Sequence, residues 1–138
     1  MICVLAGGVG AARLLNGLKD VAPPEEITAI VNTGDDAIMH GLYICPDIDT
    51  GTYTLAGVNN IETGWGLKGE TWLAMESLKK LGGKTWFNLG DRDLATHLER
   101  TRRIIAGESL TEITSDFCRK FKISAQILRL EQDSFSKA

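Results

Sequence analysis

The first 31 residues alternate between apolar runs and a glycine-rich loop in an order that strongly constrains the fold. Residues 2–6 form a continuous apolar run, which is typical of a strand buried on both faces. The loop Gly7-Gly8-Val9-Gly10 ends this run, and residues 11–21 then carry apolar side chains at the helical period until Pro23-Pro24. A second apolar run covers residues 27–31. Strand, glycine loop, helix and strand predict a right-handed βαβ unit in a parallel sheet.

The rest of the chain predicts further helices and strands without a repeat, a linker or a low-complexity segment. Ser109 and Glu112 have the spacing of a capping box, which marks the start of a helix. Residues 46–50 are expected to form a polar loop. The predicted elements are an extended segment at 42–45, helices at 71–81, at 94–105 and after Ser109, and strands at 86–89 and 125–130. Together they indicate one α/β unit over residues 1–130, followed by a polar tail at 131–138.

The charge balance excludes two classes of partner. Lys and Arg together number 15 and Asp and Glu number 18, which gives a formal net charge of −3. Nucleic-acid and anionic-membrane surfaces need clustered cations, so neither partner is expected. No apolar run approaches the ~20 residues of a membrane span, and no basic segment precedes an apolar stretch as in a secretory signal. The three widely spaced cysteines suit a reducing compartment, and we expect a cytoplasmic protein.

The glycine loop is a candidate phosphate-binding site. It lies between a predicted strand and a predicted helix, where Gly7, Gly8 and Gly10 would let backbone N–H groups approach an anion at the helix N-terminus. The loop is not a dinucleotide fingerprint, because Arg13 stands where the third glycine of that pattern belongs. A glycine turn that serves only close packing of strand and helix is the alternative.

A second glycine-rich segment, residues 64–71, has the spacing of a Walker A loop without its chemistry. Glu70 stands where the phosphate-binding lysine belongs, and this reversed charge excludes an ordinary P-loop. Trp65 could stack on a planar ligand, although a packing role is commoner for tryptophan.

Three acidic pairs follow three of the apolar runs. Ligands of open parallel sheets bind beyond the carboxyl ends of the strands, so loops at these positions are expected to meet there. Carboxylates gathered in one place repel one another unless a cation is present, and Mg²⁺ accepts one or two carboxylates together with phosphate oxygens. Aspartate also favours turns and helix N-caps, which is the alternative for each pair. The pairs are Asp35-Asp36, Asp47-x-Asp49 and Asp91-x-Asp93.

Basic residues near the third pair have less specific assignments. Arg92 suits bidentate contact with phosphate or contact with a planar ring, or it pairs with its acidic neighbours. His97 lies one helical turn after Asp93 and could orient a ligand, but a packing role is favoured. The three arginines that follow are expected on a solvated or subunit-contacting helix face: Arg100, Arg102 and Arg103.

The motifs occur together in an order that resembles the 2-phospho-L-lactate transferase family of coenzyme F(420) biosynthesis. The glycine loop and the Asn-Thr-Gly-Asp-Asp motif at 32–36 are shared with a wider set of Rossmann-like nucleotide-binding proteins. The Pro-Asp-Ile-Asp-Thr motif at 46–50, the Trp-Gly pair at 65–66 and Leu-Gly-Asp-Arg-Asp-Leu-Ala-Thr-His at 89–97 complete the set. The first and last of these three are far more specific to the family. The resemblance runs from residue 1 to about residue 130.

The resemblance implies a Mg²⁺-dependent transfer of a phospholactyl or phosphoenolpyruvyl group from a GDP-linked donor. The acceptor would be the terminal ribityl hydroxyl of the deazaflavin Fo (7,8-didemethyl-8-hydroxy-5-deazariboflavin), and GMP would leave. Asp49 and Arg92 match family positions that contact this acceptor, and the resemblance implies that they are the catalytic residues. We expect neither to support the folded core, because each is placed in a polar loop. The other implied substrate-binding residues are Gly7, Gly8, Gly10, Asn32, Asp36, Asp91, Asp93 and His97, and the implied metal ligands are Asp35, Asp47 and Asp49.

The resemblance also implies a homodimer and a Rossmann-like three-layer α/β/α fold with a mainly parallel sheet. Members of the family are longer than this chain, so we expect residues 1–130 to be the N-terminal part of the family domain, with an incomplete sheet. The tail at 131–138 diverges from the family pattern, and a truncated form is expected. The alternative function is a non-catalytic module that binds a nucleotide or nucleotide sugar, because the glycine loop and the 32–36 motif are not specific to the transferases.

Overall fold

The computed structural model describes residues 1–130, and its centre is a parallel three-stranded sheet in the order β1-β2-β5. The strands are β1 (Ile2–Ala6), β2 (Ile27–Val31) and β5 (Gln126–Arg129). β1 pairs with β2 from Ile2 opposite Ile27 to Ala6 opposite Val31, and β5 pairs with the other edge of β2. The βαβ unit, the parallel sheet and the strand near residue 126 are therefore confirmed, and the fold is a Rossmann-like α/β fold.

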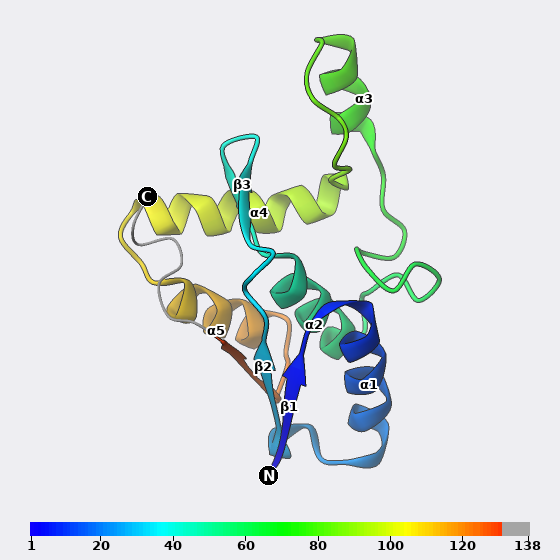
Figure 1. Ribbon diagram of the computed structural model, residues 1–138, viewed down its shortest axis with the longest axis vertical. Coiled ribbons are helices and arrows are strands. Elements are labelled where there is room, and N and C mark those ends of the chain that lie inside the picture. The colour runs from blue at the N-terminus through cyan, green and yellow to red at the C-terminus, as the bar shows by residue number, and fades with distance from the viewer. Residues whose placement is uncertain (131–138) are drawn as a thin grey trace.

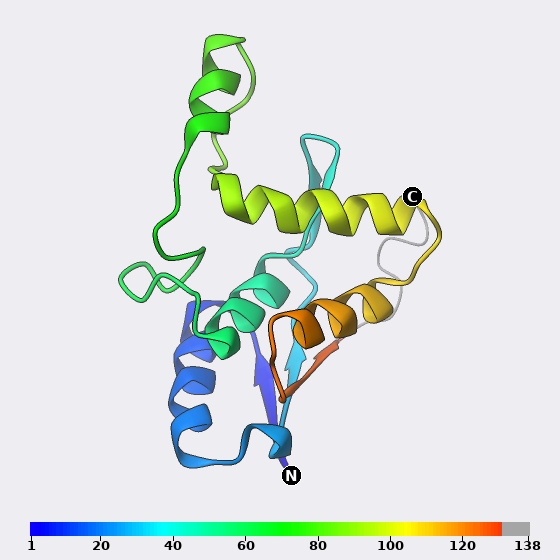
Figure 2. The same ribbon diagram turned by 180° about the vertical axis from the view of Figure 1, so that it is seen from behind.

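Helices cover one face of this sheet. They are α1 (Gly8–Val21), α2 (Pro46–Ala56) and α5 (Leu110–Lys120), and Figures 1 and 2 show them beside the strands. The side chains of Val4, Ala29 and Ile127 point toward these helices and are buried in the main core with Leu15. Leu5 points the other way and is 77% exposed. The expectation that β1 is buried on both faces is wrong for residues 1–130. Within these residues helices cover only one face of the sheet, so two of the three expected layers are present.

The remaining elements form a smaller second core above the sheet. A short 3₁₀ turn, Pro24–Glu26, precedes β2. After β2, the strands β3 (Ala37–Met39) and β4 (Leu42–Ile44) form an antiparallel hairpin. Two more helices are α3 (Leu73–Lys80) and α4 (Asp91–Ile105). The second core contains Ile44, Met75 and Leu89. In Figure 1, α4 crosses between the sheet and α3, and α3 lies at the end of the molecule farthest from the sheet.

Two predictions of secondary structure are wrong. Residues 86–89 do not form a strand, because their apolar side chains pack into the second core and against a cavity instead of pairing in a sheet. Residues 46–50 are not a loop but the first turn and a half of α2. Pro46 occupies the first helical position, where its missing N–H costs nothing, and Asp47 lies in the first turn, where a negative charge suits the helix dipole.

The other helix predictions are confirmed with shifted ends. α3 and α4 overlap the predicted helices, and α4 begins three residues earlier than its apolar pattern. Ser109 and Glu112 form the predicted capping box at the start of α5. Within residues 1–130, none of the helices combines the length and the hydrophobicity that crossing a membrane requires. The predicted tail at 131–138 lies outside the described residues.

Candidate functional site

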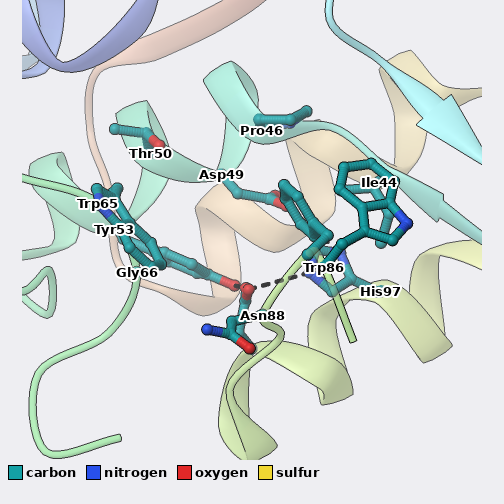
Figure 3. A pocket seen from close by; sticks show the side chains of 12 residues that line it. Ile44, Pro46, Asp49, Thr50, Tyr53, Trp65, Gly66, Trp86, Asn88 and His97 are labelled. Carbon is teal, nitrogen blue, oxygen red and sulfur yellow. Dashed lines mark hydrogen bonds and ion pairs between the residues drawn. The ribbon is translucent and has the colours of Figure 1, made fainter. Parts of the chain in front are cut away.

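A cavity of about 400 Å³ opens between α2, α4 and two irregular segments. Figure 3 shows the aromatic side chains of Tyr53, Trp65 and Trp86 in its walls, and Phe87 also lines it. Trp65 and Trp86 are 46% and 75% exposed. An apolar cavity with aromatic walls and a few polar groups is the usual form of a small-molecule site. The other lining residues are Ile44, Pro46, Asp49, Thr50, Gly66, Asn88, Asp93 and His97.

A buried ion pair lies beside this cavity, and only its carboxylate lines the cavity. Asp49 on α2 and Arg100 on α4 are 6% and 1% exposed, and Arg100 Nη2 donates to Asp49 Oδ1. Arg100 Nη1 donates to the Tyr43 carbonyl oxygen, 3.1 Å away. Asp49 Oδ2 is buried and, within residues 1–130, accepts no hydrogen bond. The carboxylate therefore has one oxygen fixed by the guanidinium and one buried oxygen without a hydrogen-bond donor among the described residues.

His97 connects this ion pair to a second carboxylate. Arg100 Nη1 lies 3.2 Å from His97 Nδ1, and because arginine can only donate, Nδ1 is the acceptor. Neutral His97 therefore carries its proton on Nε2, which donates to Asp93 Oδ2 at 3.1 Å. Tyr53 Oη donates to Asp93 Oδ1 at 2.6 Å. One side of the cavity is thus a continuous hydrogen-bonded network between α2 and α4, and Figure 3 shows His97 and Asp49 approaching each other from these helices.

Burial and hydrogen bonding shift the pKa values of the two carboxyls in opposite directions. Burial raises the pKa of Asp49, and the positive charge of Arg100 opposes this shift without cancelling it. Burial also acts to raise the pKa of Asp93, but hydrogen bonds from His97 and Tyr53 outweigh it, so the net shift is downward. The hydroxyl of Tyr53 has a pKa raised by burial and stays protonated as a donor. Asp93 is the ionised structural member of the pair, and Asp49 is the more basic one.

A second polar cluster lies at the carboxyl ends of β1 and β2. Gly8 has φ +68°, a left-handed conformation that favours glycine, and its N–H donates to Asp47 Oδ1 at 3.1 Å. Asn32 Nδ2 lies 2.9 Å from Asp47 Oδ2 and 3.4 Å from Asp35 Oδ2. The glycine loop, the end of β2 and the start of α2 therefore meet, as the sequence predicted for loops at the carboxyl ends of parallel strands.

The first turn of α4 is held by Glu70. Its Oε1 accepts from Arg92 N at 2.9 Å and its Oε2 accepts from Asp93 N at 3.0 Å. Asp91 in turn caps the N-terminus of α3. Its carboxylate accepts hydrogen bonds from Ala74 N and Leu73 N, and these bonds lower the pKa of Asp91. Glu70, which stands where a P-loop has its lysine, thus caps the N-terminus of a helix.

The structure divides the predicted site residues between these three places. Asp49, Asp93 and His97 meet at the cavity, whereas Arg92 is exposed beside it and donates through Nη1 to the Lys68 carbonyl oxygen. Asp91 is occupied as the cap of α3. Asp36 lies near Cys45, and burial raises its pKa to about 6. The remaining predicted residues lie in or next to the cluster at the strand ends: Gly7, Gly8, Gly10, Asn32, Asp35 and Asp47.

Three expectations about individual side chains are wrong. Arg92 was expected in a polar loop, but it lies in the first turn of α4. Asp49 was expected in a polar loop without a role in the fold, but it is buried in α2 and paired with Arg100. Arg100 was expected on an exposed helix face together with Arg102 and Arg103. Only Arg102 is exposed there, and Arg103 is half-buried between Glu108 and Asp116. The sequence analysis did not identify Tyr53 and Trp86 as lining residues. For the polar network one signal was available, because Asp93, His97 and Arg100 are spaced four and three residues apart and so share one helix face.

Two places in the structure bring together carboxylates, which are ligands that Mg²⁺ prefers. Asp35 and Asp47 approach the same amide group of Asn32, and Mg²⁺ favours one or two carboxylates with phosphate oxygens and water. Asp49, Asp93 and His97 also offer ligand atoms within 4.8 Å of one another. The Arg100 guanidinium already compensates Asp49 there, and an imidazole nitrogen is not a ligand that Mg²⁺ prefers.

Comparison with known proteins agrees with this arrangement of motifs. The family model described as 2-phospho-L-lactate transferase CofD matches residues 2–136. A phosphoenolpyruvate transferase of Nocardia farcinica is 50% identical over 133 residues, which are 96% of this chain and 40% of that protein. Phosphoenolpyruvate transferases of Streptomyces griseus and Mycolicibacterium smegmatis are 48% and 47% identical over 96% and 92% of this chain and 42% of each relative. The chain thus spans about two fifths of the length of these relatives, and it belongs to the 2-phospho-L-lactate transferase CofD family.

Proposed function

We propose that this chain carries the acceptor site and the diphosphate-binding loop of a transferase of coenzyme F(420) biosynthesis. The reaction would move a 2-phospho-L-lactyl or phosphoenolpyruvyl group from a GDP-linked donor to the deazaflavin Fo and release GMP. The family membership supports the transferase class, and the names of the relatives support a phosphoenolpyruvyl donor. The expected homodimer and cytoplasmic location stay predictions.

The observation that carries this proposal is the aromatic-walled cavity with an unpaired carboxylate oxygen at its base. A deazaflavin consists of a planar tricyclic ring and a ribityl chain of hydroxyls. Tyr53, Trp65 and Trp86 offer faces and edges on which such a ring can stack. Asp49 Oδ2 is buried and accepts no hydrogen bond among residues 1–130, so a hydroxyl that donates to it would remove the cost of an unsatisfied polar atom.

The proposed division of labour follows from the two polar clusters. Asp49 accepts a hydrogen bond from the attacking hydroxyl and orients its oxygen toward the donor phosphate. The glycine loop and the start of α1 lie beside Asp47, where backbone N–H groups and the helix dipole favour a diphosphate. Asp35 and Asp47 would hold Mg²⁺. When bound, this ion would neutralise charge that develops on the phosphate oxygens.

The experiment is a titration of this chain with Fo, followed by deazaflavin fluorescence. Trp86→Ala should weaken binding by about tenfold, because one stacking contact is worth about 1–1.5 kcal/mol. Trp72→Ala is the matched control, since Trp72 is also partly exposed on an irregular segment but does not line this cavity. Equal affinities of wild type and Trp86→Ala, or no binding of Fo at all, would refute the acceptor site.

The same titration with GDP separates the transferase from the alternative module. If the proposal holds, the chain should bind both Fo and GDP, because it carries both proposed sites. Binding of GDP together with failure to bind Fo would favour a nucleotide-binding module without transfer activity.

A further inference from the structure

We infer that Arg100 is a positioning residue of the acceptor site, which keeps Asp49 Oδ2 free for the acceptor hydroxyl. The inference rests on the proposed function for the identity of the ligand. Its structural part, the control of His97 and Asp49 by one guanidinium, stands on the contacts of Arg100 alone. Arg100 does not line the cavity, so it acts through Asp49 and His97.

The position of the guanidinium is fixed from three directions. Nη2 donates to Asp49 Oδ1, and Nη1 lies 3.1 Å from the Tyr43 carbonyl oxygen and 3.2 Å from His97 Nδ1. With 1% of its surface exposed, Arg100 cannot move toward water to find other partners. A planar fork with several donors can make these contacts together, which the single ammonium of a lysine cannot.

The contact with His97 determines which atom of Asp49 is available. His97 Nδ1 lies 3.6 Å from Asp49 Oδ2, the closest imidazole nitrogen to that oxygen. As long as Arg100 donates to Nδ1, this nitrogen has no proton and cannot donate to Oδ2. Without Arg100, a proton on Nδ1 would find Oδ2 as its nearest acceptor and would occupy the oxygen that the ligand needs.

A structural role alone would predict something different. If Arg100 served only to neutralise a buried aspartate, any variant that folds would leave the tautomer of His97 unchanged. The ring nitrogens of His97 therefore report on the positioning role without any ligand. They can be observed in ¹⁵N-labelled protein by NMR correlation of the imidazole nitrogens with the ring carbon-bound protons.

The test uses Arg100→Met and Arg100→Lys, with Arg102→Met as the control. Arg102 lies on the same helix, is exposed and pairs only with Glu99 among the contacts of residues 1–130 that involve its side chain. In wild type and Arg102→Met, His97 should carry its proton on Nε2 alone. In Arg100→Met, Nδ1 should gain a proton and Fo should bind about tenfold or more weakly, the effect of one lost hydrogen bond to a charged group.

Arg100→Lys keeps the positive charge and serves if the methionine variant does not fold. It should hold Asp49 but release His97, and so change the tautomer and weaken Fo binding in the same direction. A folded variant of Arg100 with the wild-type tautomer and less than a twofold change in Fo affinity would overturn the inference. If wild type itself fails to bind Fo, the proposed function fails, while the tautomers of His97 still decide what Arg100 does to Asp49.

Discussion

Replacement of Gly90 by alanine should destabilise the protein through a steric conflict with Glu70 alone. Gly90 has φ −69° and ψ 154°, a conformation that alanine adopts easily, so backbone strain contributes nothing. A Cβ at this position would lie 2.1 Å from Glu70 Cγ and 2.3 Å from Glu70 Cδ. The carboxylate would have to leave the N-terminus of α4 and give up its bonds to Arg92 N and Asp93 N.

The cost can be worked out from these lost bonds. Loss of a side chain that caps a helix costs about 1–2 kcal/mol, and loss of its charge at the positive end of the helix dipole about 0.3–1 kcal/mol more. The expected total is about 2 kcal/mol, which for a domain of this size lowers the melting temperature by roughly 6–10 °C. The start of α4 also carries Asp93 and leads to His97, so Fo affinity should fall as well.

Thermal and urea unfolding of Gly90→Ala, Glu70→Ala and the double variant form the assay. Because both single changes remove the same cap, the double variant should be no less stable than Glu70→Ala. Gly17→Ala is the control, since Gly17 is exposed within α1 and no atom lies within 4 Å of the added Cβ. It should stabilise the protein by about 0.5–1 kcal/mol. Additive losses in the double variant would show that Gly90 and Glu70 do not act on each other.

Three further predictions concern charged groups. Asp49→Asn should abolish measurable Fo binding and lower the free energy of unfolding by about 3 kcal/mol, because Arg100 then stays buried without its partner. Binding titrations and urea unfolding measure the two effects, and unchanged stability would contradict the ion pair. In calorimetry, GDP should bind more tightly in the presence of Mg²⁺ than in the presence of EDTA, and Asp47→Asn should remove this difference. Asp20→Asn is the control and should retain the difference, because Asp20 is an exposed residue of α1. Hydrogen bonds from Lys120 and Arg103 hold the pKa of Asp116 far below its usual 3.8. The contribution of ionised Asp116 to the stability of the folded protein is therefore fully present above pH 3.8 and is lost as the pH falls through the lowered folded-state pKa. The difference in melting temperature between wild type and Asp116→Asn should therefore be largest near pH 7 and narrow on acidification, and a difference independent of pH would refute the assignment.

The sequence alone determined the elements whose signals are local. Apolar runs at 2–6 and 27–31, joined by a glycine loop and an amphipathic helix, predict parallel strands because a βαβ crossover has few alternatives. The capping box at Ser109 predicts the start of α5 because both of its bonds lie within four residues. The order of short motifs was sufficient to indicate the family, since each motif is a contiguous string.

The cavity and its polar base depended on contacts that no local pattern specifies. Residues 86–89 resemble a strand because most of them are apolar, but Phe87 and Leu89 pack in the second core and Trp86 lines the cavity. Asp47 and Asp49 resemble a loop motif because aspartate is common in turns. In the tertiary structure they belong to α2, which packs against α1 and the sheet, and Asp49 is buried by its pairing with Arg100.

Arg100 shows the limit most clearly. Charged side chains are almost always exposed, so the sequence favours the surface for every arginine of α4. Whether one of them is buried depends on a partner 51 residues earlier in the chain, which the fold brings to its guanidinium. The sequence thus determined the sheet, the helices with local caps and the family, whereas the tertiary structure decided which carboxylate is buried, which oxygen it leaves free and which residues surround it. The physical reason is that burial and pairing of charge are properties of long-range contacts, and a pattern read along the chain records only its neighbours.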